Sequence, residues 1–181
     1  IIKTLEENDL LDNTLIIISS DNGPVLNDGY DDHAEELLNG HDPMGGLRGG
    51  KYSCYEAGTR VPFIVYYPKE IKEGKVSEAL VSQIDFLEVM ANLINISEYK
   101  KLSPDGIGKE LDTWLGKDKR GRRYVIQMAQ NQNLSYRTRK WKYITPCEGP
   151  DTLNWAPNIE TGYSEKPQFF RIKKGRRDFE L

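Results

Sequence analysis

A short run of aliphatic and β-branched residues, ended abruptly by a turn, is the feature that most limits what this chain can fold into. Thr14–Ser19 reads Thr-Leu-Ile-Ile-Ile-Ser, a continuous apolar pattern that is typical of a strand buried on both faces. The sequence Asp21-Asn22-Gly23-Pro24 then stops the strand. Ile1–Leu11 has helical spacing, and a helix followed by a buried strand predicts an α/β domain.

The composition is that of a globular protein. Of the 181 residues, 38% are hydrophobic and 29% are charged, so the chain is expected to form a packed core. The formal net charge of −3 favours neither a nucleic-acid nor a membrane partner. No apolar run is long enough to cross a bilayer, and no signal peptide begins the chain. Because Ile1–Leu11 resembles the end of a helix without a start Met, we expect the chain to be a fragment.

Further along, strand and helix patterns continue to alternate. Arg60–Tyr67 is a second apolar run that predicts a buried strand. Ser82–Asp85 predicts a capping box, followed by a helix that packs on the sheet through a regularly spaced apolar face: Ile84, Leu87, Ala91 and Ile94. Asp105-Gly106 predicts a turn, and Gly108–Leu115 predicts a short helix.

The character of the sequence changes near residue 118. We place a boundary there, between a layered domain at 1–118 and an antiparallel subdomain with its tail at 119–181. Tyr124–Met128 predicts a strand, and the segments 136–138 and 141–144 predict a hairpin. Residues 150–181 are irregular and rich in Pro, Asn and aromatic residues, and no structure is assigned to them.

Asp21 and Asn22 are the first candidates for a binding site. A buried strand places a carboxylate and an amide at its carboxyl end, where open α/β sheets bind ligands. Two adjacent oxygen ligands suit a hard cation such as Ca²⁺ or Mg²⁺. The alternative is that Asp-Asn-Gly is only turn chemistry, and on these residues alone that alternative is the commoner one.

The second candidate is a glycine-rich segment, Gly45–Lys51. It satisfies most of the phosphate-loop pattern, but Tyr52 stands where a Ser or Thr would hold Mg²⁺, and no strand precedes the loop. We therefore reject a nucleotide-binding loop. What remains is a flexible loop that presents Lys51, and with it Arg48, to a tetrahedral anion. The alternative is an ordinary solvent-exposed lysine.

Three weaker candidates complete the inventory. His33 and His41 lie in the long loop, and His41, which is nearer the glycine-rich segment, is the better candidate for a substrate contact. Cys54 and Cys147 lack a nearby His that would activate them, and Cys54 fits a small core residue equally well. The basic and aromatic residues of Arg137–Tyr143 could indicate nucleic-acid binding, but the acidic overall balance favours a hairpin with aromatic side chains on the core and basic groups in water.

Taken in order, these segments resemble the sulfatase family. Leu11–Gly23 is similar to the family's D-N-T, apolar strand, S-D-N-G segment, and Leu47–Lys51 to its L-R-G-x-K. Tyr55–Pro62 is similar to E-G-G-x-R-V-P, and Arg137–Tyr143 to R-T-x-x-W-K-Y. Val81–Asp85 and Asp105-Gly106 stand where the family has its next helix and a D-G turn. The resemblance spans Ile1 to about Thr145, and this many motifs in the family's order are highly specific.

The resemblance implies an alkaline-phosphatase-like α/β fold, with a large mixed sheet between helices followed by a small antiparallel subdomain. Residues 1–118 would be the C-terminal part of the catalytic domain. Asp21 and Asn22 would bind the active-site Ca²⁺, and Lys51 would bind a sulfate oxygen and stabilise charge in the transition state. The long loop before Lys51 would set substrate specificity.

The family's C/S-x-P-x-R motif, whose Cys or Ser becomes the formylglycine nucleophile, does not occur in this sequence. The resemblance implies that it lies in a missing N-terminal half of the same polypeptide, with the remaining metal ligands. We expect this chain alone to be inactive and to bind Ca²⁺ weakly. The resemblance further implies a sulfated small molecule or glycan as the substrate and a periplasmic, lysosomal or secreted location.

Two rival interpretations stay open at this point. One is a phosphatase, phosphodiesterase or phosphonate hydrolase of the same superfamily, although His33 and His41 do not follow an obvious metal-binding spacing. The other is a non-catalytic module that binds carbohydrate or anions, which would explain the missing nucleophile without a truncation.

Overall fold

The computed structural model describes residues 1–181 apart from 73, 97–109, 131, 173–178 and 181. The chain forms two compact units. Unit 1 combines Ile1–Ser19 with Phe63–Arg123, and unit 2 combines Ser20–Pro62 with Tyr124–Leu181. The long loop after the first strand therefore belongs with the C-terminal strands. The boundary between residues 118 and 119 stays a prediction.

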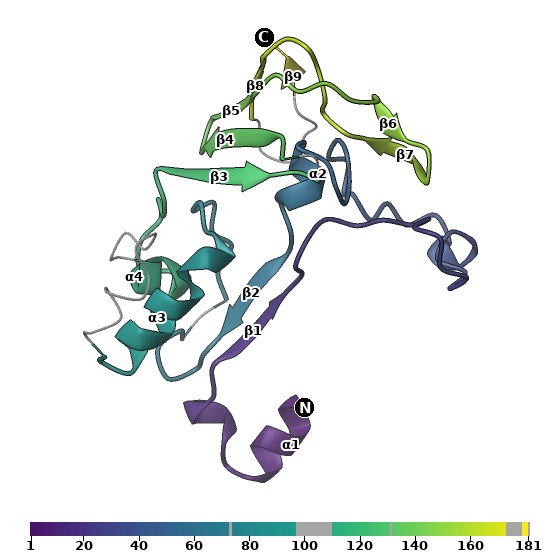
Figure 1. Ribbon diagram of the computed structural model, residues 1–181. Helices are drawn as coiled ribbons and strands as arrows, with labels where there is room; N and C mark the ends of the chain where they lie inside the picture. Colours follow the sequence, from purple (N-terminus) through teal and green to yellow (C-terminus); the bar gives the residue numbers. More distant parts are fainter. Residues whose placement is uncertain (73, 97–109, 131, 173–178, 181) are drawn as a thin grey trace. The chain divides into compact units, whose positions relative to one another are not determined.

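Unit 1 begins with the expected helix and strand. The helix α1 spans Ile2–Glu7, a 3₁₀ turn spans Leu11–Asn13, and β1 spans Ile16–Ser19. β1 pairs antiparallel with β2, Phe63–Tyr66, in register from Ile16↔Tyr66 to Ser19↔Phe63 (Figure 1). The strands lie where the apolar runs predicted them.

The prediction that β1 is buried on both faces is wrong for the described structure. Ile18 on β1 is 54% exposed, and Ile64 and Tyr66 on β2 are 53% and 42% exposed. The reason is that, among the residues that the structure describes, β1 and β2 pair only with each other in a two-stranded sheet. Within the described residues, unit 1 therefore contains the two-stranded sheet β1-β2, with helices in the same unit, as part of a mixed α/β fold.

The helical half of unit 1 also differs in detail from the prediction. A 3₁₀ turn at Gln83–Asp85 leads into α3, Phe86–Leu93, and α4 spans Glu110–Trp114. The predicted capping box does not form: the Ser82 side chain makes no capping hydrogen bond, and the Asp85 carboxylate accepts from Arg122 Nε and Nη2 at 2.9 and 2.7 Å. The predicted turn at Asp105-Gly106 lies outside the described residues.

The predicted apolar face of α3 is largely solvent-exposed. Ile84, Leu87 and Ile94 are 55%, 45% and 64% exposed, and of the four predicted core residues only Ala91 is buried. The buried residues of α3 are Glu88, Val89 and Ala91. Within the described residues, the helix therefore buries a different side from the one that its apolar spacing predicted.

Unit 2 is built on a five-stranded antiparallel sheet in the order β3-β4-β5-β8-β9. β3 spans Tyr124–Met128, β4 Leu134–Thr138, β5 Trp141–Ile144, β8 Gln168–Arg171 and β9 Phe179–Glu180. The predicted strand at 124–128 and the predicted β4–β5 hairpin are confirmed.

The orientation predicted for that hairpin is wrong. Trp141 and Tyr143, which were expected to face the core, are 36% and 37% exposed, whereas Lys142 is completely buried. The reason is a buried carboxylate on the opposite element, Glu56, which binds the Lys142 ammonium at 3.2 Å.

Two hydrophobic clusters hold unit 2 together. The first joins Cys54 and Tyr55 to the sheet residues Ala129, Ile144 and Phe170, so Cys54 is confirmed as a core residue. Burial raises the pKa of its thiol to about 11, which makes it a poor nucleophile. The second cluster lies under a hairpin of β6, Thr152–Leu153, and β7, Ala156–Glu160, in the segment to which no structure was assigned.

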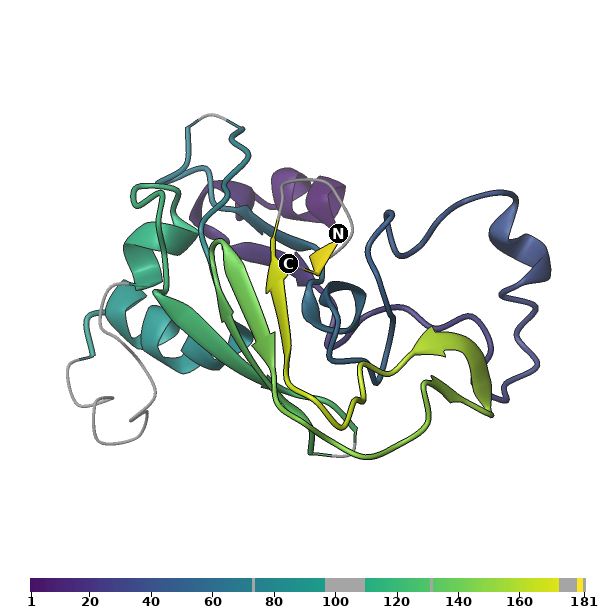
Figure 2. The same ribbon diagram turned by 90° about the horizontal axis from the view of Figure 1, so that it is seen from above.

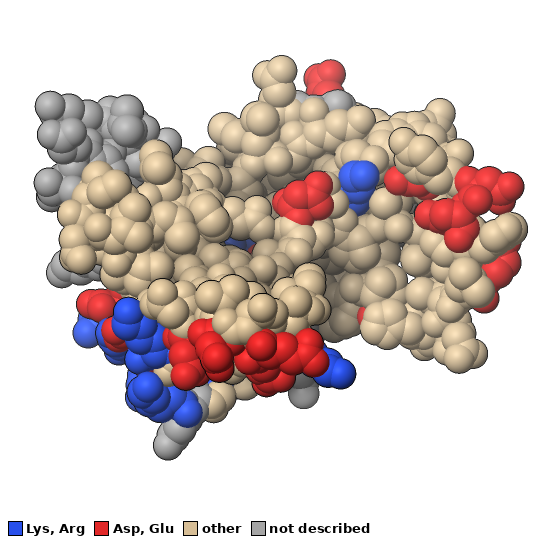
Figure 3. All heavy atoms as spheres, turned by 90° about the horizontal axis from the view of Figure 1, so that it is seen from below, with Lys and Arg blue, Asp and Glu red and all other residues tan. Residues whose placement is uncertain are grey.

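The charged side chains are distributed without a continuous basic surface on the face drawn in Figure 3, as far as the described residues show. Basic side chains on this face lie beside acidic ones. No helix in the described part of the chain is long and apolar enough to cross a membrane.

Candidate active site

All five residues predicted for the site lie in unit 2: Asp21, Asn22, His41, Arg48 and Lys51. The Lys51 N–H donates to the Pro24 carbonyl at 2.8 Å, so the glycine-rich loop lies against the segment that directly follows Asn22. The charge of Asp21 is the last and smallest of the contributions that shift the pKa of Lys51, and it raises that pKa. The structure thus brings the segment after Asn22 and the loop that carries Lys51 together.

The close approach of these two segments depends on Gly50 and on a local hydrophobic cluster. A Cβ on Gly50 would lie 2.8 Å from the Pro24 carbonyl oxygen, so only glycine allows this contact. Val25 and Tyr52 then pack together on the β6–β7 hairpin, against Leu153, Ala156 and Ile159. In Figures 1 and 2 the hairpin lies next to the first part of the loop.

Lys51 is held as an ammonium group at the edge of this cluster. Its side chain is 29% exposed, and Nζ lies 3.9 Å from Asp28 Oδ2 and 5.2 Å from the Tyr52 ring centroid. A hydrogen bond with Tyr52 raises the pKa of Lys51 most, partial burial lowers it, and the charges of Asp28 and Asp21 raise it further. Lys51 is therefore cationic at neutral pH.

Asp21 and Asn22 form a turn and keep oxygen ligands available at the same time. Asp21 Oδ1 accepts from the Asn22 N–H at 3.0 Å and from the Ser20 hydroxyl at 3.4 Å. The Asn22 amide nitrogen donates to the Gly23 carbonyl at 2.9 Å, which leaves its acceptor oxygen as the remaining polar atom. Both readings of Asp-Asn-Gly, turn and ligand, are compatible with this geometry.

The donor set fits part of a Ca²⁺ site. A carboxylate and a side-chain carbonyl are ligands that Ca²⁺ prefers, but the ion takes about six to eight oxygens. No group of three or more His, Cys, Asp or Glu side chains is placed to hold a metal among the residues that the structure describes. Other ligands must complete the shell.

A four-residue helix, α2 at Glu56–Thr59, fixes both loop segments. The Gly23 N–H donates to the Gly58 carbonyl at 2.9 Å, and the Ala57 N–H donates to the Arg48 carbonyl at 2.9 Å. α2 therefore connects the residue after Asn22 to the loop that carries Lys51.

α2 is in turn anchored to the sheet by Glu56, which the sequence analysis did not single out. Its carboxylate accepts from Lys142 Nζ on β5 at 3.2 Å and from Arg137 Nη2 on β4 at 3.0 Å. Burial alone would raise the pKa of Glu56, but Lys142 and Arg137 outweigh it and lower the pKa to about 2. The sequence did carry a signal for these ion pairs: Glu56 lies in the motif Tyr55–Pro62, and Arg137 and Lys142 lie in the motif Arg137–Tyr143.

Arg48 and His41 have no described side-chain contact with Asp21, Asn22 or Lys51. Arg48 Nε and Nη2 each donate to the Glu160 carboxylate at 2.8 Å, and its guanidinium lies 4.0 Å above the Tyr55 ring. His41 is exposed, and its N–H donates to the Leu38 carbonyl after the 3₁₀ turn Glu36–Leu38. Their roles in substrate binding stay predictions.

Two further residues that were missed lie beside Lys51, namely Asp28 and Tyr52, and a third, Trp155, packs edge-on against Tyr52. Tyr52 has φ of 77°, a left-handed conformation that a bulky residue rarely adopts. Trp155 lies in the turn between β6 and β7, in a segment whose sequence carries no regular pattern, so only the fold brings it to Tyr52.

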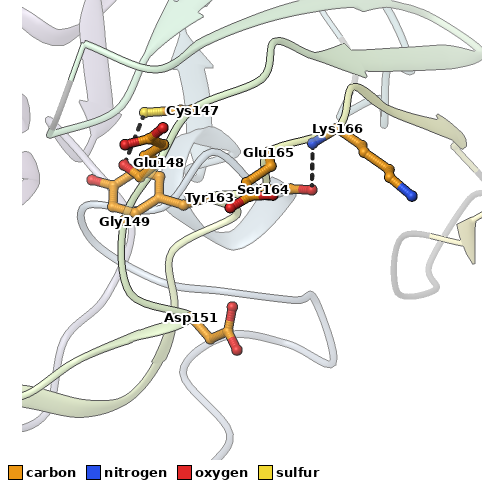
Figure 4. Close-up of a pocket in the computed structure, with 8 residues that line it drawn as sticks. All are labelled: Cys147, Glu148, Gly149, Asp151, Tyr163, Ser164, Glu165 and Lys166. Atoms are coloured by element: carbon orange, nitrogen blue, oxygen red, sulfur yellow. Dashed lines mark hydrogen bonds between the residues drawn. The ribbon is translucent and has the colours of Figure 1, made fainter.

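A separate pocket of about 500 Å³ opens elsewhere in unit 2 (Figure 4). None of the five predicted site residues lines it, although Cys147, one of the weaker candidates, does. Its lining consists of Cys147, Glu148, Gly149, Asp151, Tyr163, Ser164, Glu165 and Lys166. Three carboxylates against one ammonium group make it unsuited to an anion.

The comparisons with known proteins agree with the motif order. The sequence profile of a family described as Sulfatase matches residues 1–96. An N-acetylgalactosamine-6-O-sulfatase of Bacteroides thetaiotaomicron is 46% identical over 95% of this chain and 33% of that protein.

Solved structures show the same fold. A structure from work on the metabolism of multiple glycosaminoglycans by Bacteroides thetaiotaomicron superimposes with a TM-score of 0.86 and 44% identity, over 93% of this chain and 35% of that one. The PsFucS1 sulfatase of Pseudoalteromonas sp. gives a TM-score of 0.67 and 25% identity, over 93% and 32%. The chain spans about a third of the length of the proteins that it matches.

Proposed function

Because the chain belongs to the sulfatase family, with an alkaline-phosphatase-like α/β fold, we propose that it forms part of an enzyme that hydrolyses sulfate esters of sugars. The observation that carries the proposal is that the loop carrying Lys51 is hydrogen-bonded to the segment directly after Asn22, with the Lys51 ammonium group 3.9 Å from Asp28 Oδ2 in the same unit. The 46% identical relative acts on N-acetylgalactosamine 6-sulfate by its name, and a 6-sulfated N-acetylhexosamine is the substrate that we propose.

Lys51 is proposed to bind a sulfate oxygen. A fixed ammonium group beside a tetrahedral anion stabilises the negative charge that shifts onto the leaving oxygen during cleavage of the ester. The hydrogen bond with Tyr52 and the charges of Asp28 and Asp21 raise the pKa of Lys51, so the ammonium group is present before the substrate arrives. The substrate sulfate then competes with Asp28, 3.9 Å away, for the same ammonium group.

Asp21 and Asn22 are proposed to hold Ca²⁺ through their side-chain oxygens. The bound ion would supply a Lewis acid for the sulfate oxygens. These two residues cannot complete its coordination, and we propose that further ligands come from a part of the full-length protein outside these 181 residues.

The nucleophile is proposed to be a formylglycine outside these 181 residues, since the sequence contains no C/S-x-P-x-R motif. The isolated chain is then expected to show no turnover of a sulfate ester. An exported location, in the periplasm, the lysosome or the extracellular space, is proposed on the grounds of family membership.

A lysine substitution in the full-length protein tests the function. Lys51→Ala is expected to lower kcat/KM for the 6-sulfated N-acetylhexosamine by roughly 10²–10³-fold, the usual cost of a charge-stabilising donor. It should also weaken inhibition by inorganic sulfate, because the same ammonium group binds both anions.

Lys166→Ala is the matched control, since Lys166 is an exposed lysine of unit 2 that lines the acidic pocket. It should leave both kcat/KM and sulfate inhibition unchanged. Retention of more than half of the wild-type kcat/KM by Lys51→Ala, or an equal loss in both variants, contradicts the proposed site.

A further inference from the structure

An aromatic pair stands directly beside Lys51. The Tyr52 and Trp155 ring centroids are 4.6 Å apart at an interplanar angle of 73°. Lys51 Nζ lies 5.2 Å from the Tyr52 ring. The Tyr52 ring is thus a neighbour of both the ammonium group and the indole, and Trp155 remains 41% exposed.

The pair is held by the fold and does not depend on the flexibility of a loop. Trp155 occupies the turn of the β6–β7 hairpin, whose Leu153, Ala156 and Ile159 pack against Tyr52. The edge-on contact with Tyr52 leaves at least one face of the indole free of that ring. An exposed and anchored aromatic surface is therefore available next to a cation.

This combination matches one class of ligand. A sulfated pyranose has an apolar C–H face and an anionic sulfate on the same small molecule. Aromatic rings bind apolar faces in well-defined geometry, and a few polar groups fix the orientation of the ligand. On the proposed function, in which Lys51 binds the sulfate, the sugar ring attached to that sulfate has to lie within a few ångströms of Lys51.

We propose that Trp155 is a substrate-binding residue, whose indole stacks on the ring of the sugar whose sulfate is bound at Lys51. The inference rests on the proposed function and adds a specificity determinant to it. Trp155 would favour sulfate esters of pyranoses over inorganic sulfate, which has no ring to stack.

A second tryptophan provides the matched control. Trp141 also lies in unit 2 and is 36% exposed, but its ring stacks on Phe169, with centroids 5.2 Å apart, and Arg171 lies 6.0 Å away. It has no described contact with Lys51 or Tyr52. Substituting it removes an equally exposed indole from elsewhere in the unit.

The test uses the full-length protein and compares Trp155→Leu, Trp155→Phe and Trp141→Leu. Leu preserves apolar packing on Tyr52 but offers no ring face, whereas Phe restores one. Trp155→Leu is expected to raise KM for the 6-sulfated N-acetylhexosamine about tenfold, with kcat within about threefold, because stacking binds ground state and transition state alike. Trp155→Phe should recover most of the loss, and Trp141→Leu should match the wild type.

Inorganic sulfate separates stacking from damage to the loop. Its inhibition constant should be unchanged in Trp155→Leu and weakened in Lys51→Ala. A KM within twofold of wild type in Trp155→Leu overturns the inference, and so does an equal weakening of sulfate inhibition, which would mean that Trp155 only supports the loop.

Unsulfated N-acetylgalactosamine tests Trp155 independently of the sulfatase reaction. Ligand-observed NMR should detect weak binding that Trp155→Leu abolishes and Lys51→Ala retains. Failure of the proposed function shows as absent turnover of sulfated sugars by the wild type, whereas failure of this inference shows as sugar binding that Trp155→Leu leaves intact.

Discussion

Glu56 is a carboxylate with 2% of its surface exposed, and it binds cations from two neighbouring strands. Lys142 is fully buried and Arg137 is largely buried, so neither can be solvated if the carboxylate is lost. Removal of one partner from a buried ion pair leaves an uncompensated charge, which costs more than the pair itself contributes. Glu56 is thus the residue on which the attachment of α2 to the sheet depends.

Glu56→Gln is predicted to destabilise the protein by about 3–5 kcal/mol, because the Lys142 ammonium stays buried without a counter-ion. Chemical denaturation of the full-length protein, followed by a signal from unit 2, measures the change. Glu70→Gln is the control: its partner Lys117 is half exposed, and removal of such a surface pair should have no measurable effect. Equal stability of both variants would refute the role of Glu56.

At the scale of elements, α2 is the part that aligns the site. It receives the Gly23 N–H at its C-terminal end and donates from Ala57 to the Arg48 carbonyl. A helix of four residues is not stable by itself. Its position therefore depends on the Glu56 ion pairs and on these tertiary hydrogen bonds.

Gly23→Ala is predicted to disrupt the site, because a Cβ at this position would lie 1.7 Å from the Ala57 carbonyl oxygen. The backbone has to move, and with it Asp21 and Asn22. A displacement of about 1 Å near the reacting groups can cost 10²-fold in rate. We expect kcat/KM to fall at least about tenfold, as measured with the 6-sulfated sugar.

Gly74→Ala is the comparison, since nothing lies within 4 Å of the Cβ that it would add. This variant should keep wild-type kinetics. If Gly23→Ala also keeps them, the contact between α2 and the Asp21-Asn22 turn is not what positions the ligands.

At the scale of the whole molecule, the two units are predicted to respond to pH in opposite directions. In unit 2, the pKa of Glu56 is lowered from 4.5 to about 2, so its stabilisation is present above pH 4.5 and is lost as the pH falls towards 2. In unit 1, burial raises the pKa of Glu110 from 4.5 to about 7, with Asp85 adding to the shift. The contribution of Glu110 to the folding stability of unit 1 is therefore complete below pH 4.5, and it is lost as the pH rises through 7.

Hydrogen exchange with mass spectrometry, corrected for intrinsic exchange rates, measures the protection of backbone amides in each of the two units of the full-length protein. Protection of α4 should decline between pH 5 and 8, while protection of β4 and β5 should decline only in acid. Glu110→Gln should remove the first effect and stabilise unit 1 by on the order of 2 kcal/mol at pH 8. A decline of both units over the same pH range contradicts the assignment.

Several elements could be predicted from the sequence because their signals are local. The apolar runs at Ile16–Ser19 and Phe63–Tyr66, the strand Tyr124–Met128 and the hairpin that follows it all lie where period and turn residues indicated. The site residues Asp21 and Lys51 also stand out locally, one at the end of a strand and the other after paired glycines.

The sequence by itself thus predicted the positions of the strands up to β5 and the resemblance to the family, and it singled out the residues that we propose to bind a cation or an anion. The tertiary structure decided which side chains meet. Glu56 and Lys142 are separated by 86 residues, and Arg48 and Glu160 by 112. The burial of Lys142 and the contact of Trp155 with Tyr52 likewise depend on segments that are far apart in the sequence. A local pattern reports the neighbours of a residue within a few positions, whereas the partner of a buried charge or an aromatic ring depends on how distant segments fold against each other.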